Sequence, residues 1–481
     1  MNLTSLTLTQ LLPKHRFARS VSIMAGGTAL AQFAGILAAP VLTRIYAPDD
    51  FGILAAFVAL LAIVSVFSTL RYDLAIPLPK SDQEAAPALG LCFIAVTIFS
   101  LLAAVVTYSS GEEVGGLIRL PQLSHYLWLL PIAIAFGGIY ESLLYWAIRS
   151  HAFPLIARTK IYQVLTLLIV QLSTFPLGSL GLLLGLVAGQ AMAAVCLALP
   201  LMRQRWLLFR QIRVADLFRT ARRYRRFPLF STWASGFSIL STHIPPLMLA
   251  ALFSPAAAGL YAVSHRILAM PMGMVGQAVG DAFRAEAAEA RREARLPSLV
   301  INIYEKLVQI AMPPALLLIL TGPELFALVF GSEWRMAGEF SQWMAPWLLL
   351  HFVVSPLSLL FDVLEKQLQE MMFQSILLAS RLAALFLGYW VKDVTWTVAL
   401  FAMASTLCYL GKLVWLFMLT IGDWRPLCRP LLRSLGWAGA LSSPIVIAEG
   451  FNTTTALWLV GMGLALALIG ARYLLLLREA W

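Results

Sequence analysis

The stretch Tyr-Ala-Pro-Asp-Asp-Phe-Gly-Ile-Leu-Ala at residues 46–55 is a short polar break between two long apolar runs. Pro48 and Gly52 lie four residues apart in it. A second copy, Phe-Ser-Pro-Ala-Ala-Ala-Gly-Leu-Tyr-Ala at residues 253–262, gives Pro255 and Gly259 the same spacing. Pro favours helix starts, and a repeated pattern at a fixed offset indicates repeated architecture. Two matching hairpins between apolar helices therefore predict a chain built from two related halves.

The composition predicts that lipid is the solvent of this chain. Of its 481 residues, 60% are hydrophobic and 12% are charged, whereas ordinary soluble domains carry about 25% charged residues. An apolar excess along the whole length cannot be hidden in one soluble core, so we predict an all-α polytopic membrane protein. The first 20 residues lack the apolar core and small-residue cleavage site of a secretory signal peptide, and we expect none.

Apolar runs of about 20 residues between charged or Pro/Gly breaks predict about fourteen spanning helices. We place them at 20–44, 51–70, 86–107, 124–147, 155–175, 180–202, 228–251, 256–279, 299–321, 341–361, 370–390, 394–419, 431–448 and 453–476.

The distribution of basic residues tests this topology independently. With a cytoplasmic N-terminus, about 27 of the 35 Lys and Arg fall on the cytoplasmic side. The positive-inside rule predicts this asymmetry for an even number of helices with both termini in the cytoplasm. Losing one pair of helices would preserve it, so twelve helices are also compatible. The remaining basic residues are Arg44, Arg119, Arg335 and Lys392 outside, and Arg266, Lys306, Arg381 and Lys412 within helices.

The order of the helices predicts the domain organisation. Six helices precede a basic link, so the seventh starts on the same side as the first and the two six-helix repeats are parallel. We expect an N-lobe at 1–202, a cytoplasmic link at 203–227, a C-lobe at 228–420 and two extra helices at 421–481. The two lobes would face a central cavity.

The basic link has an amphipathic pattern. Leu217, Ala221 and Tyr224 share one face of a helix, and arginines surround the rest. This pattern suits contact with anionic membrane lipids, and a purely topogenic role for the charge is an equal alternative. Because most Lys and Arg of the whole chain follow the positive-inside distribution, the net charge of +11 is mostly topogenic. We predict no nucleic-acid partner.

Four basic side chains in the spanning helices of the second half are candidate cavity residues: Arg266, Arg381, Lys412 and His243. Embedded ionisable groups are costly and mark functional sites by default. Cations lining a cavity suit an anionic cargo, because Arg can hold phosphate oxygens with two parallel hydrogen bonds. The alternative is that each pairs with a carboxylate or a backbone carbonyl and only holds helices together.

Acidic residues supply candidates for ion coupling or gating. Glu141 is embedded in the fourth predicted helix, and Arg71, Tyr72 and Asp73 form a polar cluster at the predicted cytoplasmic end of the second. From their chemistry alone, the cluster could be a gate, a headgroup contact or a helix stop.

Motifs of soluble enzymes are absent from the sequence. There is no Gly-rich phosphate loop, His-Glu-x-x-His or Gly-x-Ser-x-Gly pattern, and the four Cys and six His lack metal-ligand spacing. We therefore predict no catalytic residue, no metal and no cofactor. No aqueous segment is long enough for a separate soluble domain, so the protein must act in or across the bilayer.

Three stretches carry a family resemblance. Leu-Thr-Arg-Ile-Tyr-Ala-Pro-Asp-Asp-Phe-Gly (42–52) and Leu-Arg-Tyr-Asp-Leu-Ala-Ile-Pro-Leu-Pro (70–79) resemble the start of bacterial polysaccharide-transport flippases. Ser-Pro-Ala-Ala-Ala-Gly-Leu-Tyr-Ala-Val (254–263) resembles their second-half motif. These exporters belong to the superfamily of multidrug, oligosaccharidyl-lipid and polysaccharide exporters.

The resemblance implies a function. Such proteins move undecaprenyl-pyrophosphate-linked oligosaccharides across the bacterial inner membrane for O-antigen, capsule or exopolysaccharide synthesis. It also implies two six-helix lobes around a cationic cavity, alternating access, and a polysaccharide polymerase and chain-length proteins as partners. Relatives are thought to couple transport to an ion gradient, for which H⁺ or Na⁺ would serve here, through Glu141 or Asp73.

Three other functions compete with this one. A multidrug cation/proton antiporter of the sister family would need carboxylates in its cavity, and no acidic residue lies between Ser20 and Arg44. A membrane-embedded polymerase or ligase would show one large periplasmic loop, whereas the outside segments here are short. A scaffold, or a lipid scramblase without energy coupling, is also compatible with the sequence.

Overall fold

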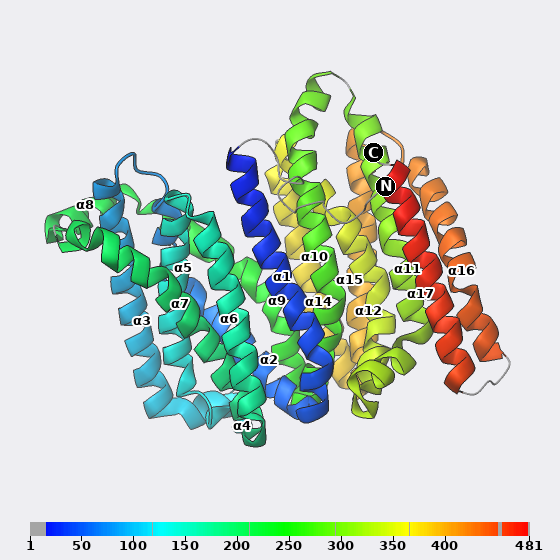
Figure 1. The fold of residues 1–481 in the computed structure, drawn as a ribbon, viewed down its shortest axis with the longest axis horizontal. Coiled ribbons are helices and arrows are strands. Elements are labelled where there is room, and N and C mark those ends of the chain that lie inside the picture. The colour runs from blue at the N-terminus through cyan, green and yellow to red at the C-terminus, as the bar shows by residue number, and fades with distance from the viewer. Residues whose placement is uncertain are drawn as a thin grey trace, which may run out of the picture. The chain divides into compact units, whose positions relative to one another are not determined.

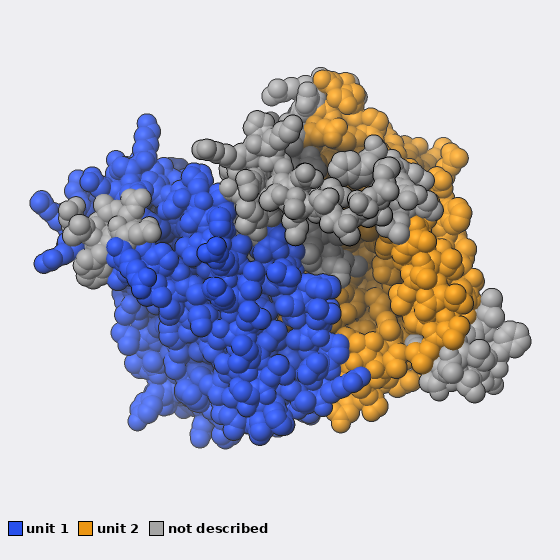
Figure 2. Space-filling view, viewed as in Figure 1, with its two compact units in different colours: residues 1–262 blue, residues 263–481 orange. Residues whose placement is uncertain are grey.

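The computed structural model describes residues 16–117, 119–210, 212–293, 295–364, 366–450 and 455–479, and these ranges contain helices and no strand (Figure 1). Contacts divide the chain into unit 1, residues 1–262, and unit 2, residues 263–481 (Figure 2). The boundary falls inside α10 (Pro255–Arg292), so α9 and the first turns of α10 group with unit 1. The lobe boundaries expected from the sequence stay a prediction.

Unit 1 holds the first seven long helices. Its elements are α1 (Arg16–Ile45), α2 (Pro48–Ser68), η2 (Tyr72–Ala75), α3 (Asp82–Leu117), α4 (Pro121–Ser124), α5 (Leu129–Arg149), α6 (Phe153–Ser173), η3 (Phe175–Leu177), α7 (Ser179–Arg210), α8 (Val214–Arg223), η4 (Phe227–Ser231) and α9 (Thr232–Leu252). Within it, α6 packs against α7 and α1, α3 against α5, and α2 against α9.

Unit 2 continues from α10 through seven more helices. They are α11 (Leu296–Phe330), α12 (Arg335–Leu357), α13 (Leu360–Val363), α14 (Gln367–Val391), α15 (Val394–Thr420), α16 (Cys428–Gly450) and α17 (Thr455–Glu479), with the short turns η5 (Ser332–Trp334) and η6 (Arg425–Leu427). α11 packs against α12 and α16, α15 against α12 and α14, and α16 against α17.

The all-α polytopic fold class is confirmed. In the described ranges, fourteen helices have 21 residues or more, and they follow the fourteen expected ranges in order. Nine of them are long and apolar enough to cross a membrane, and α9 with the preceding π-helix turn makes a tenth as a bent pair. Over their described residues α10, α12, α16 and α17 do not meet that criterion, and α17 counts only as the shorter apolar helix Leu459–Tyr473.

Small residues allow α6 and α7 of unit 1 to pack closely. Gly181, Gly185 and Gly189 recur every four residues on α7, which places them on one face of that helix. A Cβ atom at Gly185 would lie 2.8 Å from the backbone oxygen of Leu167 on α6. Packing of this kind replaces the hydrophobic effect as a driving force between helices in lipid.

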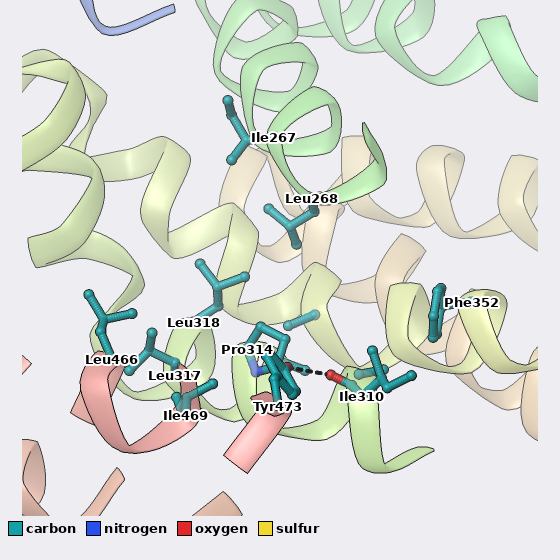
Figure 3. Close-up of a pocket in the computed structure, with 13 residues that line it drawn as sticks. Ile267, Leu268, Ile310, Pro314, Leu317, Leu318, Phe352, Leu466, Ile469 and Tyr473 are labelled. Carbon is teal, nitrogen blue, oxygen red and sulfur yellow. Dashed lines mark hydrogen bonds between the residues drawn. The ribbon is translucent and has the colours of Figure 1, made fainter. Parts of the chain in front are cut away.

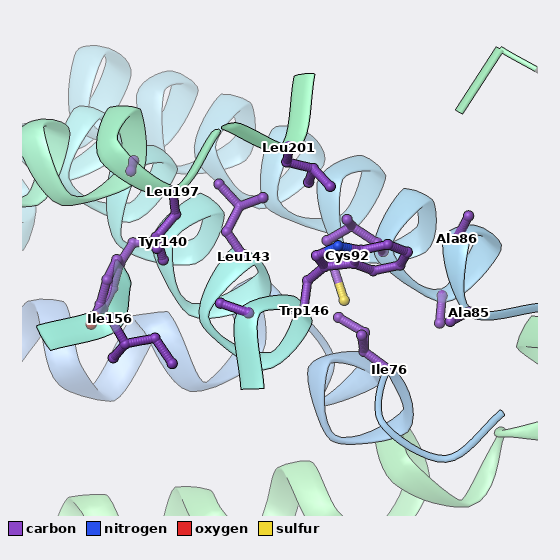
Figure 4. Packing of buried hydrophobic residues seen from close by; sticks show 14 of the residues in the cluster. Ile76, Ala85, Ala86, Cys92, Tyr140, Leu143, Trp146, Ile156, Leu197 and Leu201 are labelled. Atoms are coloured by element: carbon purple, nitrogen blue, oxygen red, sulfur yellow. The ribbon is translucent and has the colours of Figure 1, made fainter. Parts of the chain in front are cut away.

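The buried cluster of unit 1 fixes the segment that follows α2. Figure 4 shows Trp146 of α5 beside Ile76 and Cys92 of α3, and Tyr140 of α5 beside Ile156 in the same cluster. Ile76 and Cys92 are fully buried. The chain after η2 is therefore held against three helices and is not a loose connection.

Candidate functional site

A strained turn ends α2. Leu70 and Arg71 have φ angles of 48° and 57°, in the left-handed region that residues with a Cβ atom rarely adopt. Such conformations cost about 1–3 kcal/mol each and persist only where the surroundings fix them. Two adjacent strained residues therefore indicate that the position of the Arg71 side chain matters.

Arg149 fixes the chain on the far side of this turn. Its Nη1 atom donates hydrogen bonds to the backbone oxygens of Pro79, at 2.6 Å, and of Ile76, at 3.4 Å. Its Nε atom pairs with the carboxylate of Asp82 at 3.2 Å. One guanidinium at the end of α5 thus holds both the 76–79 segment and the start of α3.

Asp73 lies inside this fixed segment and is fully buried. Its Oδ1 atom accepts a hydrogen bond from the Thr69 hydroxyl at 2.7 Å, and its Oδ2 atom lies 3.8 Å from Nη1 of Arg71. Burial raises the pKa of Asp73 above its ordinary value, against the opposing hydrogen bond from Thr69 and the charge of Arg71. Asp73 is therefore placed to hold a proton that an exposed aspartate would release.

This pKa shift predicts a pH-dependent stability. Asp73 binds its proton more tightly in the folded protein than in the unfolded chain. Its protonation therefore stabilises the fold fully below the pKa of the unfolded chain, and this stabilisation is lost as the pH rises through the raised pKa of the folded state. We expect Asp73→Asn, which mimics the protonated acid, to flatten the fall in unfolding temperature as the pH rises above about 4. Thermal unfolding in nanodiscs measures this. Glu113→Gln, at an exposed acid, serves as control, and equal pH profiles for wild type and Asp73→Asn would contradict the assignment.

A pocket of about 400 Å³ opens beside Arg71. We call it the unit 1 polar pocket. Its apolar lining comes from Val58, Leu61, Ala62, Val66, Gly137, Gly138, Leu186 and Ile239, and its polar lining from Ser65, Ser68, Thr69, Arg71, Tyr140, Glu141, Gln163 and Gln190. The pocket therefore brings together two predicted site residues, Arg71 of the turn after α2 and Glu141 of α5.

Several polar atoms at this pocket lack a hydrogen-bond partner among the described residues. They are Nε of Arg71, the hydroxyl of Tyr140 and Oε1 of Gln190, all buried, and Oδ2 of Asp73 lies beside them without a hydrogen bond. Buried polar groups in native proteins are nearly always hydrogen-bonded, so each exception calls for an explanation. The cluster is a candidate ligand site for that reason.

The second unit buries two of the predicted cations. Lys412 forms an ion pair with Glu370 of α14 at 2.7 Å, and its ammonium lies 4.3 Å from the centre of the Phe373 ring. Arg381 lies 5.1 Å from the ring centres of Trp347 and Phe401. It also donates a hydrogen bond to Ser405, at 3.0 Å.

These contacts are those of residues that hold α14, α15 and α12 together. Only 8% of Arg381 and 3% of Lys412 is exposed. A cargo role for either residue stays a prediction, and it would require a conformation in which these contacts open.

Arg266 and His243 have different surroundings. Arg266 of α10 is exposed and His243 of α9 is half-buried. Arg266 therefore keeps accessible surface that Arg381 and Lys412 lack, and its cargo role stays a prediction. Tyr72 is buried and packs into the unit 1 cluster, away from a direct ligand role.

An apolar pocket of about 440 Å³ lies among α10, α11, α12 and α17 of unit 2 (Figure 3). Its wall includes Leu268, Pro314, Phe352 and Ile469, and Tyr473 closes one side by donating a hydrogen bond to the backbone oxygen of Ile310 at 2.6 Å. The lining is almost wholly hydrocarbon, so it suits an apolar chain and no polar ligand.

The two Pro-x-x-x-Gly hairpins contact each other. A Cβ atom at Gly52 would lie 1.7 Å from the backbone oxygen of Pro255, and one at Gly259 would lie 2.0 Å from that of Pro48. The carboxylate of Asp49, next in the chain, accepts a hydrogen bond from the backbone N–H of Ala256 at 3.1 Å. The first turns of α2 and α10 thus cross with their glycine backbones touching.

The basic link forms α8, as its pattern predicts. Leu217 faces Gly90 of α3, and Ala221 and Tyr224 pack against the unit 1 cluster. The apolar face therefore meets protein rather than headgroups. Exposed Val214 and Phe218 are left on the surface, and contact of α8 with anionic lipids stays a prediction.

Four residues of this region were not predicted from the sequence: Tyr140, Lys160, Gln190 and Arg149, which holds the 76–79 segment. Lys160 lies 4.9 Å from the centre of the Tyr140 ring and 3.5 Å from Oε1 of Gln163. A signal existed, because Gln190 and Lys160 are polar side chains within apolar runs. No group of three or more His, Cys, Asp or Glu suited to a metal ion occurs in the described ranges.

The sequence model of a family described as polysaccharide biosynthesis protein matches residues 41–338, more than half of the chain. The chain belongs to this family. The resemblance of residues 42–52, 70–79 and 254–263 is thereby confirmed at family level. No curated protein sequence matches the chain.

Solved structures share the fold of this polysaccharide biosynthesis family member. The lipid II flippase MurJ in its inward closed conformation is 9% identical, with 96% of this chain and 99% of that chain covered and a TM-score of 0.73. An inward-facing multidrug resistance transporter of the MATE family in the MOP superfamily is 12% identical, with 85% and 99% covered and a TM-score of 0.57.

A MATE transporter of Vibrio cholerae, VcmN in a mutant form, is 13% identical, with 85% and 98% covered and a TM-score of 0.52. At such identities the likeness shows the fold alone. The polysaccharide biosynthesis family member is thus a multi-pass membrane protein with the fold of these transporters.

Proposed function

We propose that this protein is a flippase that carries a polyprenyl-pyrophosphate-linked oligosaccharide across the bacterial inner membrane. The observation that carries the proposal is the match of residues 41–338 to a polysaccharide biosynthesis family in a chain with a transporter fold. The carrier lipid is undecaprenyl pyrophosphate, and the product serves O-antigen, capsule or exopolysaccharide synthesis. Both termini face the cytoplasm, and a polymerase and chain-length proteins take over the cargo outside.

The chemistry of the described surfaces supports a cargo with three parts. Exposed Arg266 offers a guanidinium to the pyrophosphate. The apolar pocket of unit 2 offers hydrocarbon lining to the carrier chain. The unit 1 polar pocket offers hydrogen-bonding groups.

Coupling to H⁺ or Na⁺ by alternating access is the second part of the proposal. Asp73 is a buried carboxyl whose pKa is raised by burial, and Glu141 lines the adjoining pocket with Arg71. A carboxyl that exchanges its proton as a strained, charged turn moves could link proton flow to lobe movement. No cofactor is needed for this cycle.

Flux of a labelled polyprenyl-pyrophosphate oligosaccharide into proteoliposomes tests the function. We expect saturable uptake that needs an ion gradient. For Arg266→Ala we expect the uptake rate to fall by about tenfold or more, since a hydrogen bond to a charged group contributes about 1.5–3 kcal/mol. Arg44→Ala, at an exposed arginine, should behave as wild type. Arg381→Ala should lose folding stability with its flux, because its contacts are internal.

A multidrug antiporter is the competing function, because MATE transporters share the fold. Wild-type flux no greater than that of empty liposomes, with cationic dyes moved instead, would overturn the flippase proposal in its favour. Uptake without any ion gradient would support the proposed cargo and contradict the proposed ion coupling.

A further inference from the structure

We propose that the unit 1 polar pocket binds one neutral sugar unit of the cargo, held by Arg71, Tyr140, Glu141 and Gln190. The proposal deepens the proposed function, on which it rests, by naming a subsite for the oligosaccharide. It starts from buried polar atoms that the fold leaves without partners.

The hydrogen-bonding groups of the pocket match a sugar ring. Arg71 Nε is a donor, the Tyr140 hydroxyl donates and accepts, and Gln190 Oε1 and the Glu141 carboxylate accept. A hydroxyl group is both donor and acceptor, so adjacent hydroxyls of one ring can satisfy all of these atoms. Tyr140 is only 7% exposed, so its hydroxyl is shielded from bulk water and has no hydrogen-bond partner among the described residues.

The apolar walls suit the rest of the ring. Leu61, Leu186 and Ile239 are among the apolar residues that line the pocket together with its polar groups. A pyranose presents C–H groups on its faces and hydroxyls around its edge, so it meets both kinds of lining. A volume of about 400 Å³ falls within the range of small-molecule sites.

The charges of the pocket select a neutral ligand. Arg71 lines it and Lys160 lies against the Tyr140 ring, while Glu141 lines it and Asp73 lies beside it. Groups of both signs therefore meet at this pocket, and a neutral polyol is a ligand that brings no further charge among them.

Neighbouring residues fix the positions of these polar groups before a ligand binds. The strained Leu70–Arg71 turn sets the direction of Arg71, and Arg149 clamps the segment that follows. Gly137 lies beside Gln190, since a Cβ atom there would be in ordinary van der Waals contact with Oε1 of Gln190 at 3.6 Å. Groups fixed before binding lose little entropy when the ligand arrives.

Saturation-transfer NMR with the full-length protein in nanodiscs tests the subsite. The probes are free glucose, galactose, mannose, rhamnose, N-acetylglucosamine and N-acetylgalactosamine at millimolar concentration. We expect at least one to receive saturation, with an affinity about three- to tenfold weaker for Tyr140→Phe, since one neutral hydrogen bond is lost. The double variant Tyr140→Phe/Gln190→Leu should lose the signal.

Tyr145→Phe is the matched control, because Tyr145 lies on the same helix, packs into the unit 1 cluster and does not line the pocket. It should bind as wild type. Thermal unfolding of each variant excludes misfolding as the cause of a loss. A second check is flux of the lipid-linked cargo, where Tyr140→Phe should raise KM with little change in kcat.

Two outcomes would overturn the subsite. One is saturation of no sugar by the wild type, and the other is equal binding by Tyr140→Phe and Tyr145→Phe. Either result combined with normal wild-type flux leaves the flippase function standing without this subsite. Sugar binding by a wild-type protein that shows no flux would support the subsite and contradict the proposed transport function.

Discussion

Adding a single methyl group at Gly52 or Gly259 is expected to be the most destabilising small change in this protein. At 1.7 Å and 2.0 Å from backbone oxygens of Pro255 and Pro48, the new carbon would have to push apart the first turns of α2 and α10. Backbone cannot move aside as a flexible side chain does. Overpacking in a well-packed interior costs about 1–3 kcal/mol and occasionally more, and we expect about 3 kcal/mol or more here.

The measurement is thermal loss of the monodisperse protein in detergent for Gly52→Ala and Gly259→Ala. The control is Gly411→Ala in α15, where nothing lies within 4 Å of a new Cβ atom. That change should be neutral or stabilise by about 0.4–1 kcal/mol, because alanine reduces the entropy of the unfolded chain. A Gly52→Ala variant as stable as Gly411→Ala would show that the two hairpins are not in close contact.

Breaking the buried ion pair of unit 2 is expected to have the next largest effect. Glu370→Gln leaves the ammonium of Lys412 buried among aromatic rings without a carboxylate. Removing one partner of a buried pair costs about 3–5 kcal/mol, whereas replacing both by apolar groups is often neutral or stabilising. We therefore expect the double variant Glu370→Leu/Lys412→Met to recover most of the unfolding temperature lost in Glu370→Gln.

This double variant also separates the two roles considered for Lys412. If the residue only holds α14 to α15, the double variant should be stable and retain flux. If Lys412 also binds cargo, the double variant should be stable and lose flux. Glu324→Gln is the control, because its pair with Arg335 is exposed and exposed pairs contribute about 0–1 kcal/mol. A Glu370→Gln variant no less stable than Glu324→Gln would contradict a stabilising role of the Lys412–Glu370 ion pair.

The surroundings of the predicted site residues depend on contacts between distant parts of the chain, which the sequence does not show. Lys412 and Arg381 were predicted on the ground that deep cations suit an anionic cargo, and the structure gives them internal partners on neighbouring helices. Arg71 was predicted as part of a local cluster, and the structure adds Tyr140 and Gln190 from α5 and α7. Each difference comes from a contact between residues far apart in the chain.

The class of this protein, the order of its fourteen long helices and the positions of its two Pro-x-x-x-Gly hairpins could be predicted from the sequence, whereas the relation between its two halves stays a prediction. Hydropathy, proline and glycine act on each segment locally, so their effects can be read along the chain. The tertiary structure alone decided that Gly52 meets Pro255, that Lys412 pairs with Glu370, and that Arg71 shares a pocket with Tyr140. Those contacts depend on how far each helix is rotated about its axis and how deep it lies. Packing against neighbouring helices sets both quantities, and no single segment encodes them.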